Sequence, residues 1–244
     1  MDAIILDNIP FEADLNALAK RLHVEPGSRD MDDLRRLAAE ALAIGRPKAL
    51  YGIAYIDSKS EESVVVDGLT LTSRVLRVNL DQVHRVFPYL ATGGMELEDW
   101  SSAISDILHR FWADTIAETA LRYAVKALEA QLDERFQPGR TSSMSPGSLA
   151  DWPMEQQTPL FHILGDTRAA IGVQLTDSYL MIPRKSVSGL RFPTEVSFTS
   201  CQLCPREVCP GRSAPYDAGL YERKYRVEVA GGGEGATAEI QDTR

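Results

Sequence analysis

The chain has 244 residues, 44% of them hydrophobic, and a net charge of −9, because 35 acidic residues outnumber 26 basic ones. Binding to a nucleic-acid backbone relies on clustered Lys and Arg, so this balance argues against nucleic acid as a partner. No segment approaches the roughly 18 apolar residues that a membrane-spanning helix needs, and no basic segment precedes the short apolar stretch at the N-terminus. We therefore expect a soluble, cytoplasmic protein with no membrane partner.

The first hundred residues combine one helical pattern with several strand patterns. Residues 30–44 place apolar side chains on one face, with Ser28 or Asp30 able to cap the start and Gly45 able to end it, which predicts an amphipathic helix. Strands are expected over residues 49–56, 63–66, 74–80 and 87–91. The pair Asp67-Gly68, followed by the alternating residues 69–72, is typical of a hairpin turn.

The remainder of the chain begins with a long helical pattern. Over residues 98–136 apolar side chains recur every three or four positions, which predicts one long helix or two, ended by Pro138-Gly139. A further helix is expected over residues 153–164, followed by strands over 170–174 and 179–182. Strands, long helices and strands in this order, without βαβ alternation, predict an α+β fold with a largely antiparallel sheet. We expect one domain over residues 1–229, with residues 190–229 as a cysteine-bearing extension, and a disordered tail over 230–244.

Small and polar residues are unusually dense between residues 142 and 189, which indicates a binding site. No helical or alternating period fits the stretch around Pro146 and Gly147, so this stretch is expected to be a shaped loop. Further along lie four hydroxyl side chains among apolar residues, and then Gly189, which permits close approach of the backbone. The hydroxyls are those of Thr176, Ser178, Ser186 and Ser188. These groups either line a site for a polar small molecule or simply satisfy nearby backbone groups.

Three motifs in the second half of the chain carry a resemblance to a known family. The string L-T-D-S-x-x-M-x-P-x-x-S-V-S-G over residues 175–189 is similar to a signature of the activation domain of vitamin B12-dependent methionine synthase. The string P-G-x-x-x-D-W-P-x-x-Q-Q-x-x-L-F over 146–161 looks like a variant of that family's P-G-Y loop in short, free-standing relatives. The string A-D-x-x-A-E over 113–118 resembles its carboxylate-bearing helix. The resemblance implies a helmet- or C-shaped mixed domain.

The resemblance also implies a site for S-adenosylmethionine. In it, Glu118 would supply a carboxylate, and the loop residues Ser145, Pro146, Gly147 and Ser148 would form a wall. The backbone near Thr176, Ser178, Ser186, Ser188 and Gly189 would border the ligand and the corrin face. The family usually has an arginine and a tyrosine where this chain has Ser143 and Ser148, so Arg140 is the expected partner for the ligand's carboxylate.

The function implied by the resemblance is reactivation of a cobalamin protein. The chain would bind S-adenosylmethionine and support reductive methylation of cob(II)alamin held by a corrinoid-binding protein or a truncated methionine synthase. The electron would come from a flavodoxin or ferredoxin-type donor. The chain's contribution would be to position the methyl group, without a nucleophile of its own. It would act within a B12-dependent methyltransferase system and not as a complete methionine synthase. A non-catalytic cap or chaperone for a corrinoid protein is the alternative of a different class.

Three cysteines gather near the C-terminus as C-x-x-C-x-x-x-x-C, formed by Cys201, Cys204 and Cys209. Thiolates two residues apart can reach one ion from a turn, so this spacing is compatible with a zinc or iron-sulfur site completed by another ligand. An electron-transfer module centred on such a metal is a further alternative. Free thiols in a reducing compartment are the alternative. The resemblance favours a metal site, because similar cysteine clusters are found at the end of the family's short relatives.

Overall fold

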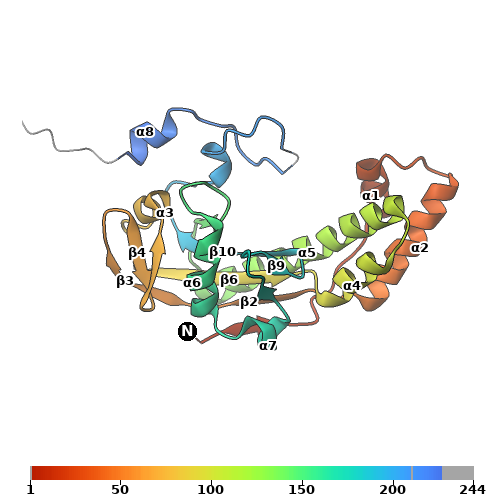
Figure 1. Ribbon diagram of the computed structural model, residues 1–244, viewed down its shortest axis with the longest axis horizontal. Helices are drawn as coiled ribbons and strands as arrows, with labels where there is room; N and C mark the ends of the chain where they lie inside the picture. The colour runs from red at the N-terminus through yellow and green to blue at the C-terminus, as the bar shows by residue number, and fades with distance from the viewer. Residues whose placement is uncertain (1, 210, 227–244) are drawn as a thin grey trace, which may run out of the picture.

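The computed structural model of the chain describes residues 2–209 and 211–226, arranged as a curved, C-shaped molecule (Figure 1). The helices are α1 (Leu15–Leu22), α2 (Arg29–Ile44), α3 (Arg74–Asn79), α4 (Met95–Ala103), α5 (Ile107–Phe136), α6 (Gln157–Leu164), α7 (Thr167–Ile171) and α8 (Leu220–Lys224), with short 3-10 turns at Met154–Gln156 and Ser200–Gln202. The strands are β1 (Ile4–Leu6), β2 (Lys48–Tyr51), β3 (Ala54–Lys59), β4 (Ser63–Val66), β5 (Leu69–Thr72), β6 (Arg85–Thr92), β7 (Thr141–Met144), β8 (Gln174–Leu175), β9 (Met181–Ile182) and β10 (Ser186–Pro193). The long helix α5 joins the α1–α2 pair at one end to the sheet at the other.

The main sheet is antiparallel throughout its described pairings and is centred on β6. Its strands follow the order β1-β2-β6-β3-β4-β5, and β10 lies against β6 on one side and β7 on the other. The β6–β10 register places Ser186 opposite Thr92 and Gly189 opposite Tyr89. The prediction of an α+β fold with a largely antiparallel sheet is therefore confirmed, as is the C shape.

Several predicted elements are confirmed and three are corrected. The helix predicted over residues 30–44 is α2, and the hairpin at Asp67-Gly68 joins β4 to β5. Residues 98–136 form the end of α4 and the whole of α5, and residues 153–164 contain a 3-10 turn followed by α6. The strand predicted over 49–56 divides into β2 and β3, which both pair with β6. The strand predicted over 170–174 is wrong except at its last residue, because α7 extends to Ile171 and β8 begins only at Gln174.

The strand predicted over residues 74–80 is also wrong, because these residues form the helix α3. Ser73 caps the helix, and its hydroxyl accepts a hydrogen bond of 2.9 Å from the backbone N–H of Leu76. The carboxylate of Asp151, far away in the sequence, accepts a second bond of 3.0 Å from the N–H of Val75. Capping of the free N–H groups stabilises this short helix. The alternating side chains of residues 74–80 gave no sign of it.

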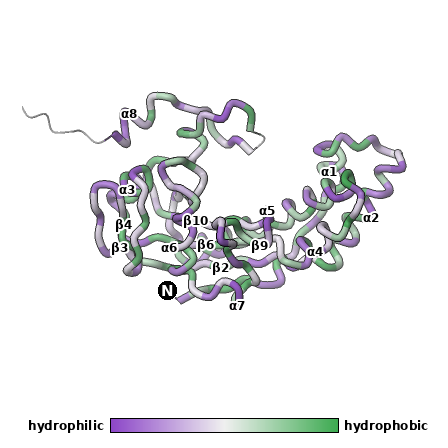
Figure 2. Tube along the Cα trace, in the orientation of Figure 1, coloured by the Kyte–Doolittle hydropathy of each residue, from purple (hydrophilic) through white to green (hydrophobic). Residues whose placement is uncertain are grey.

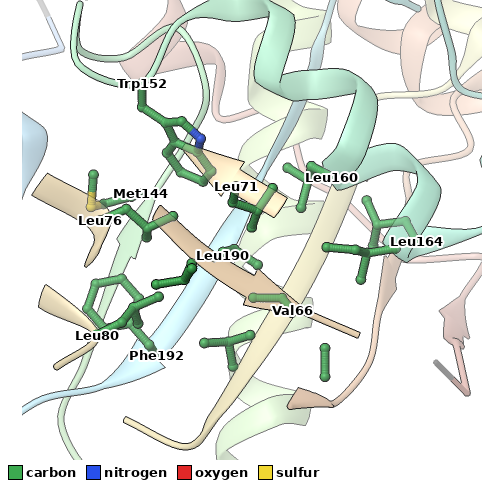
Figure 3. Packing of buried hydrophobic residues seen from close by; sticks show 14 of the residues in the cluster. Val66, Leu71, Leu76, Leu80, Met144, Trp152, Leu160, Leu164, Leu190 and Phe192 are labelled. Atoms are coloured by element: carbon green, nitrogen blue, oxygen red, sulfur yellow. The ribbon is translucent and has the colours of Figure 1, made fainter. Parts of the chain in front are cut away.

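The core divides between the two faces of the sheet and the helical end. One cluster lies between the sheet and α6, where Trp152 packs beside Leu71, Leu76 and Met144 (Figure 3). A second cluster lies between the opposite face and α5, which contributes Ala124, Leu128 and Leu132. A third cluster joins α1, α2 and α4 to the first half of α5. The helix α5 therefore contributes to two of the three clusters.

Hydrophobic residues follow the central strands, whereas the tip where α1 meets α2 is hydrophilic (Figure 2). Among the described residues, no helix combines the length and the apolar character needed to cross a bilayer. The expected disordered tail, residues 230–244, and the last residues of the expected extension lie outside the described residues.

Candidate functional site

The loop at Pro146 and the strand β10 meet at Gly189. Residues Ser145 to Ser148 form a tight turn, in which the N–H of Ser148 donates to the carbonyl of Ser145 over 3.1 Å and Gly147 has a φ of 82°. A proline followed by a glycine of positive φ is typical of a type II turn. A Cβ atom at Gly189 would lie against the carbonyl oxygen of Met144, 2.8 Å from the Tyr89 hydroxyl and 2.9 Å from Ser145 Oγ. The glycine thus allows the turn to rest on the strand.

A buried arginine lies on the same face of β10 as Gly189. Arg191 is two positions from Gly189, and it pairs directly across the sheet with Ser143 of β7. Its guanidinium contacts Glu129 of α5 and donates a bond of 2.8 Å to the hydroxyl of Thr141, and only 15% of its side chain is exposed. Burial lowers the pKa of Arg191, but arginine starts so high that it stays charged at neutral pH. We refer to Tyr89, Ser145, Gly189 and Arg191 as the β10 patch.

Glu118 lies on α5 between two arginines. Arg21 of α1 donates to Oε2 over 2.5 Å, and Arg122 donates to Oε1 over 2.8 Å. Burial raises the pKa of Glu118, but the hydrogen bonds from Arg122 and Arg21 outweigh burial, so the net pKa is below its ordinary value. Glu118 is therefore a carboxylate at neutral pH. Each oxygen uses one acceptor position, and each has a second that a ligand can occupy.

Partly buried apolar side chains lie on the same two elements as Glu118 and Arg191, namely α5 and β10. Leu121 and Val125 of α5, together with Val187 of β10, pack against the core cluster on this face of the sheet. Glu118 and Glu129, the α5 partner of Arg191, are separated by about three turns of helix, or roughly 16 Å. We call α5, together with the sheet face that it covers, the α5 face. It contains the carboxylate of Glu118, the cation of Arg191 and these apolar side chains.

The four hydroxyls predicted to border a ligand are engaged elsewhere in the structure. Ser188 donates a buried bond of 2.6 Å to Gln157 of α6, on the opposite face of the sheet from α5. Ser186 donates to Thr92 over 2.9 Å. Thr176 and Ser178 bond each other over 3.0 Å within the turn between β8 and β9. These hydroxyls thus satisfy groups of the protein. That the backbone near them borders a ligand stays a prediction.

Arg140 does not lie beside Glu118. It follows the C-terminal end of α5, and the 18 helical residues from Glu118 to Phe136 span roughly 27 Å. Its guanidinium donates instead to the carbonyl oxygen of Glu195 over 2.8 Å. Arg191 lies beside Ser143 across the β7–β10 pairing, a neighbour that only the strand register reveals. The role of Arg140 towards a ligand stays a prediction.

The cysteine-bearing segment lies next to the turn at Ser145. The hydroxyl of Ser148 is 3.1 Å from that of Ser200, which directly precedes Cys201. Arg212 donates to the carbonyl oxygens of Cys201 and Cys204 over 3.1 and 3.2 Å, so its guanidinium organises the loop through backbone groups. All three cysteines are free and partly exposed. Within residues 2–209 and 211–226, no group of three or more His, Cys, Asp or Glu side chains could hold a metal ion, so the predicted metal site stays a prediction.

The Cys201 thiol is activated by its surroundings. The hydroxyl and the backbone N–H of Ser213 each donate to its sulfur over 3.4 Å, and these bonds lower the pKa of Cys201 to about 7. Because the thiolate is the reactive form, we expect alkylation of Cys201 by iodoacetamide to reach half its maximal rate near pH 7. Peptide mass spectrometry after timed quenching measures this rate.

Replacement of Ser213 by alanine is expected to move that midpoint upward, towards the ordinary thiol value of about 8.5, because one donor to the thiolate is lost. The variant Ser200→Ala is the matched control, since the Ser200 hydroxyl contacts Ser148 and not the sulfur. An unchanged midpoint in Ser213→Ala would show that this hydroxyl does not activate the thiol.

Comparison with known proteins agrees with this arrangement. Residues 102–200 match the family model described as the vitamin B12 dependent methionine synthase, activation domain. A crystal structure of the MetH reactivation domain bound to AdoHcy is similar in fold, with a TM-score of 0.56 and 13% sequence identity, over 82% of this chain and 81% of that one. No curated protein matches the sequence. The matched residues, 102–200, include Glu118, the turn at Ser145 and the whole of β10, so this part of the chain is similar to the vitamin B12-dependent methionine synthase activation domain family.

Proposed function

We propose that this chain binds S-adenosylmethionine between Glu118 and the β10 patch, and that it supports reactivation of a cobalamin carried by another protein. The observation that carries the proposal is the family match over residues 102–200, which contains the groups that line the α5 face of the sheet. The protein of similar fold is described as bound to AdoHcy, the demethylated form of this ligand.

The chemistry of the α5 face fits the charges of S-adenosylmethionine. The ligand has a sulfonium and an ammonium group, which are cations, and one carboxylate. Arg191 can donate to the carboxylate. Glu118 is already paired with Arg21 and Arg122, and its free acceptor positions can receive hydrogen bonds from donor groups of the ligand. Leu121, Val125 and Val187 offer apolar surface to the adenine ring.

Arg191 also explains how this chain can have Ser143 where the family usually has an arginine. Directly paired residues on adjacent antiparallel strands project from the same face of the sheet, so Arg191 reaches the space beside Ser143 from the neighbouring strand. A cation on β10 can therefore serve the same carboxylate as a cation on β7. We infer that Arg191, and not Arg140, holds the carboxylate of the ligand.

The contribution of the protein would be positional. By bonding to separate parts of S-adenosylmethionine, Glu118 and Arg191 would fix the direction of the methyl group towards a partner docked over the α5 face. Bound to its own carrier protein, cobalamin would supply the metal that accepts the methyl group after a flavodoxin or ferredoxin-type donor has provided one electron. No proton transfer by a side chain is required.

Calorimetry with two ligands tests the site. Arg191→Ala is expected to weaken binding of S-adenosylmethionine roughly tenfold to a hundredfold, because a charge-assisted hydrogen bond contributes about 1.5–3 kcal/mol. The affinity for 5′-methylthioadenosine, which lacks the amino-acid portion, is expected to stay unchanged. Arg191→Lys is the matched control, since it keeps the charge and should retain part of the affinity.

The two ligands separate loss of a contact from loss of the fold. A misfolded variant would lose both ligands, whereas a variant that lacks only the carboxylate partner would lose S-adenosylmethionine selectively. Equal weakening of both ligands, or none, would contradict the role of Arg191. Failure of the unaltered protein to bind S-adenosylmethionine at millimolar concentration would favour the alternative of a non-catalytic cap, which the serine residues at 143 and 148 would allow.

Reactivation itself is tested in trans. The chain, S-adenosylmethionine, a one-electron donor and a cobalamin-loaded corrinoid protein are mixed, and the visible spectrum of the cobalamin is followed for the change from cob(II)alamin to methylcobalamin. Omission of the chain should stop the change. The electron-transfer alternative stays a prediction, which iron and sulfide analysis after anaerobic purification would address.

A further inference from the structure

A cavity of about 770 Å³ lies at the sheet end of the molecule, beyond the C-terminus of α5. Four parts of the chain enclose it: the connection from α3 to β6, the connection from α5 to β7, the segment that follows β10, and α8. The elements α3 and α8 both lie at this end of the C, away from the α1–α2 pair (Figure 1). Its volume is within the range of small-molecule sites, which is about 300–1,000 Å³.

Three cations that line this cavity lack a carboxylate partner among residues 2–209 and 211–226. Arg85 lies 5.5 Å from the centre of the Phe87 ring. Arg140 donates to a backbone carbonyl, and Lys224 donates to Asn79 over 2.8 Å. The lining contains three cations and two carboxylates, Asp81 and Glu195, so the cavity has an excess of positive charge in a protein whose net charge is −9. This local excess favours binding of an anion.

The acidic groups of the cavity do not cancel these cations. Asp81 already pairs with Arg77 over 2.5 Å, and hydrogen bonds from Arg77 and Gln82 hold its pKa below the ordinary value. Glu195 is then the one remaining carboxylate that lines the cavity in the described part of the chain, and its carbonyl oxygen, not its side chain, accepts the bond from Arg140.

Most of the remaining lining surface is apolar, although Asn79, Gln82, His84 and Thr194 also line the cavity. Val78 and Val83 are partly buried and pack against the core cluster beneath the cavity, and Pro138, Pro193 and Val196 add further apolar surface. Such a lining favours a ligand that brings hydrophobic surface out of water. A purely inorganic anion would leave this surface unused.

We propose that this cavity is a second ligand site, distinct from the α5 face, which binds a small organic anion with an apolar body. Arg85, Arg140 and Lys224 hold the acidic group, a carboxylate or a phosphate ester, and the valines and prolines contact the body. The inference does not depend on binding of S-adenosylmethionine.

Fluorescence titration of the full chain with 8-anilinonaphthalene-1-sulfonate tests the site, with octanoate, octyl phosphate and octanol as competitors. We expect octanoate or octyl phosphate to displace the probe and octanol to be at least tenfold weaker, because octanol has no charge. Since the alkyl chains match, preference between the first two identifies the acidic group. The variants Arg140→Gln and Lys224→Gln should each weaken the probe about tenfold.

Two controls keep the result interpretable. Arg140→Lys retains the charge and should bind nearly as well as the unaltered chain, which shows that substitution at this position does not disrupt the fold. Arg35→Gln removes an arginine on α2, remote from the cavity, and should bind the probe unchanged. The inference is overturned if the probe binds all variants equally, or if octanol competes as well as octanoate. In either case a nonspecific hydrophobic surface, and not this cavity, binds the probe.

Discussion

Replacement of Trp152 by alanine is expected to lower the free energy of unfolding by about 3–5 kcal/mol. Trp152 is completely buried, and its ring packs beside Leu71, Leu76 and Met144 in the core cluster between the sheet and α6 (Figure 3). The substitution removes the buried ring and leaves a cavity that rigid strands on one side cannot close. Urea denaturation followed by circular dichroism measures the loss.

Two further variants check the cause of this loss. Trp152→Phe should lose much less stability, because it keeps an aromatic ring and the indole N–H has no hydrogen-bond partner among the described residues. Leu180→Ala should be close to neutral, since that side chain is 57% exposed. A loss of less than 1 kcal/mol for Trp152→Ala would mean that the core is not packed as described.

The substitution Gly189→Ala is expected to destabilise the protein by about 1–3 kcal/mol, or more, and to displace the turn at Ser145. The added methyl group would lie against the carbonyl oxygen of Met144, which belongs to the backbone of the neighbouring strand and cannot rotate away. We expect the affinity for S-adenosylmethionine to fall in parallel, because Ser145 and Arg191 belong to the same patch. Denaturation and calorimetry on one preparation measure both effects.

Gly211 provides the matched control for this substitution. A Cβ atom at Gly211 would meet nothing within 4 Å, so Gly211→Ala should change neither the stability nor the affinity. If Gly189→Ala were as stable as the unaltered chain, the close contact between β7 and β10 would be contradicted.

Elements governed by local signals were predictable from the sequence. The 3.6-residue period of α5 continues over eight turns, and the Asp67-Gly68 hairpin needs only two residues to define it. The helix α3 was not predictable in this way. Its six residues alternate like a strand, and the carboxylate that bonds to its N-terminus belongs to Asp151, more than seventy positions later. A short helix held by a distant cap has no signal of its own.

Some parts of the candidate site could likewise be predicted from the sequence, and others could not. The turn at Pro146-Gly147 and the close approach at Gly189 follow from what proline and glycine permit, so the sequence could indicate them. Arg191 and Arg21 could not be assigned to the site, because their positions depend on strand register and on how α1 packs beside α5. The nearest arginine in sequence to the loop, Arg140, proved remote from Glu118 in space.

The thirty-residue helix α5 also determines how this molecule loses its structure. Its first half supplies Trp112 and Ile116 to the cluster shared with α1 and α2, and its second half supplies Leu128 and Leu132 to the cluster beneath the sheet. Neither cluster can melt without exposing part of the same unbroken helix, which spans roughly 45 Å. The two ends of the molecule should therefore behave as one cooperative unit in native-state hydrogen exchange, with α5 amides protected alike along its length.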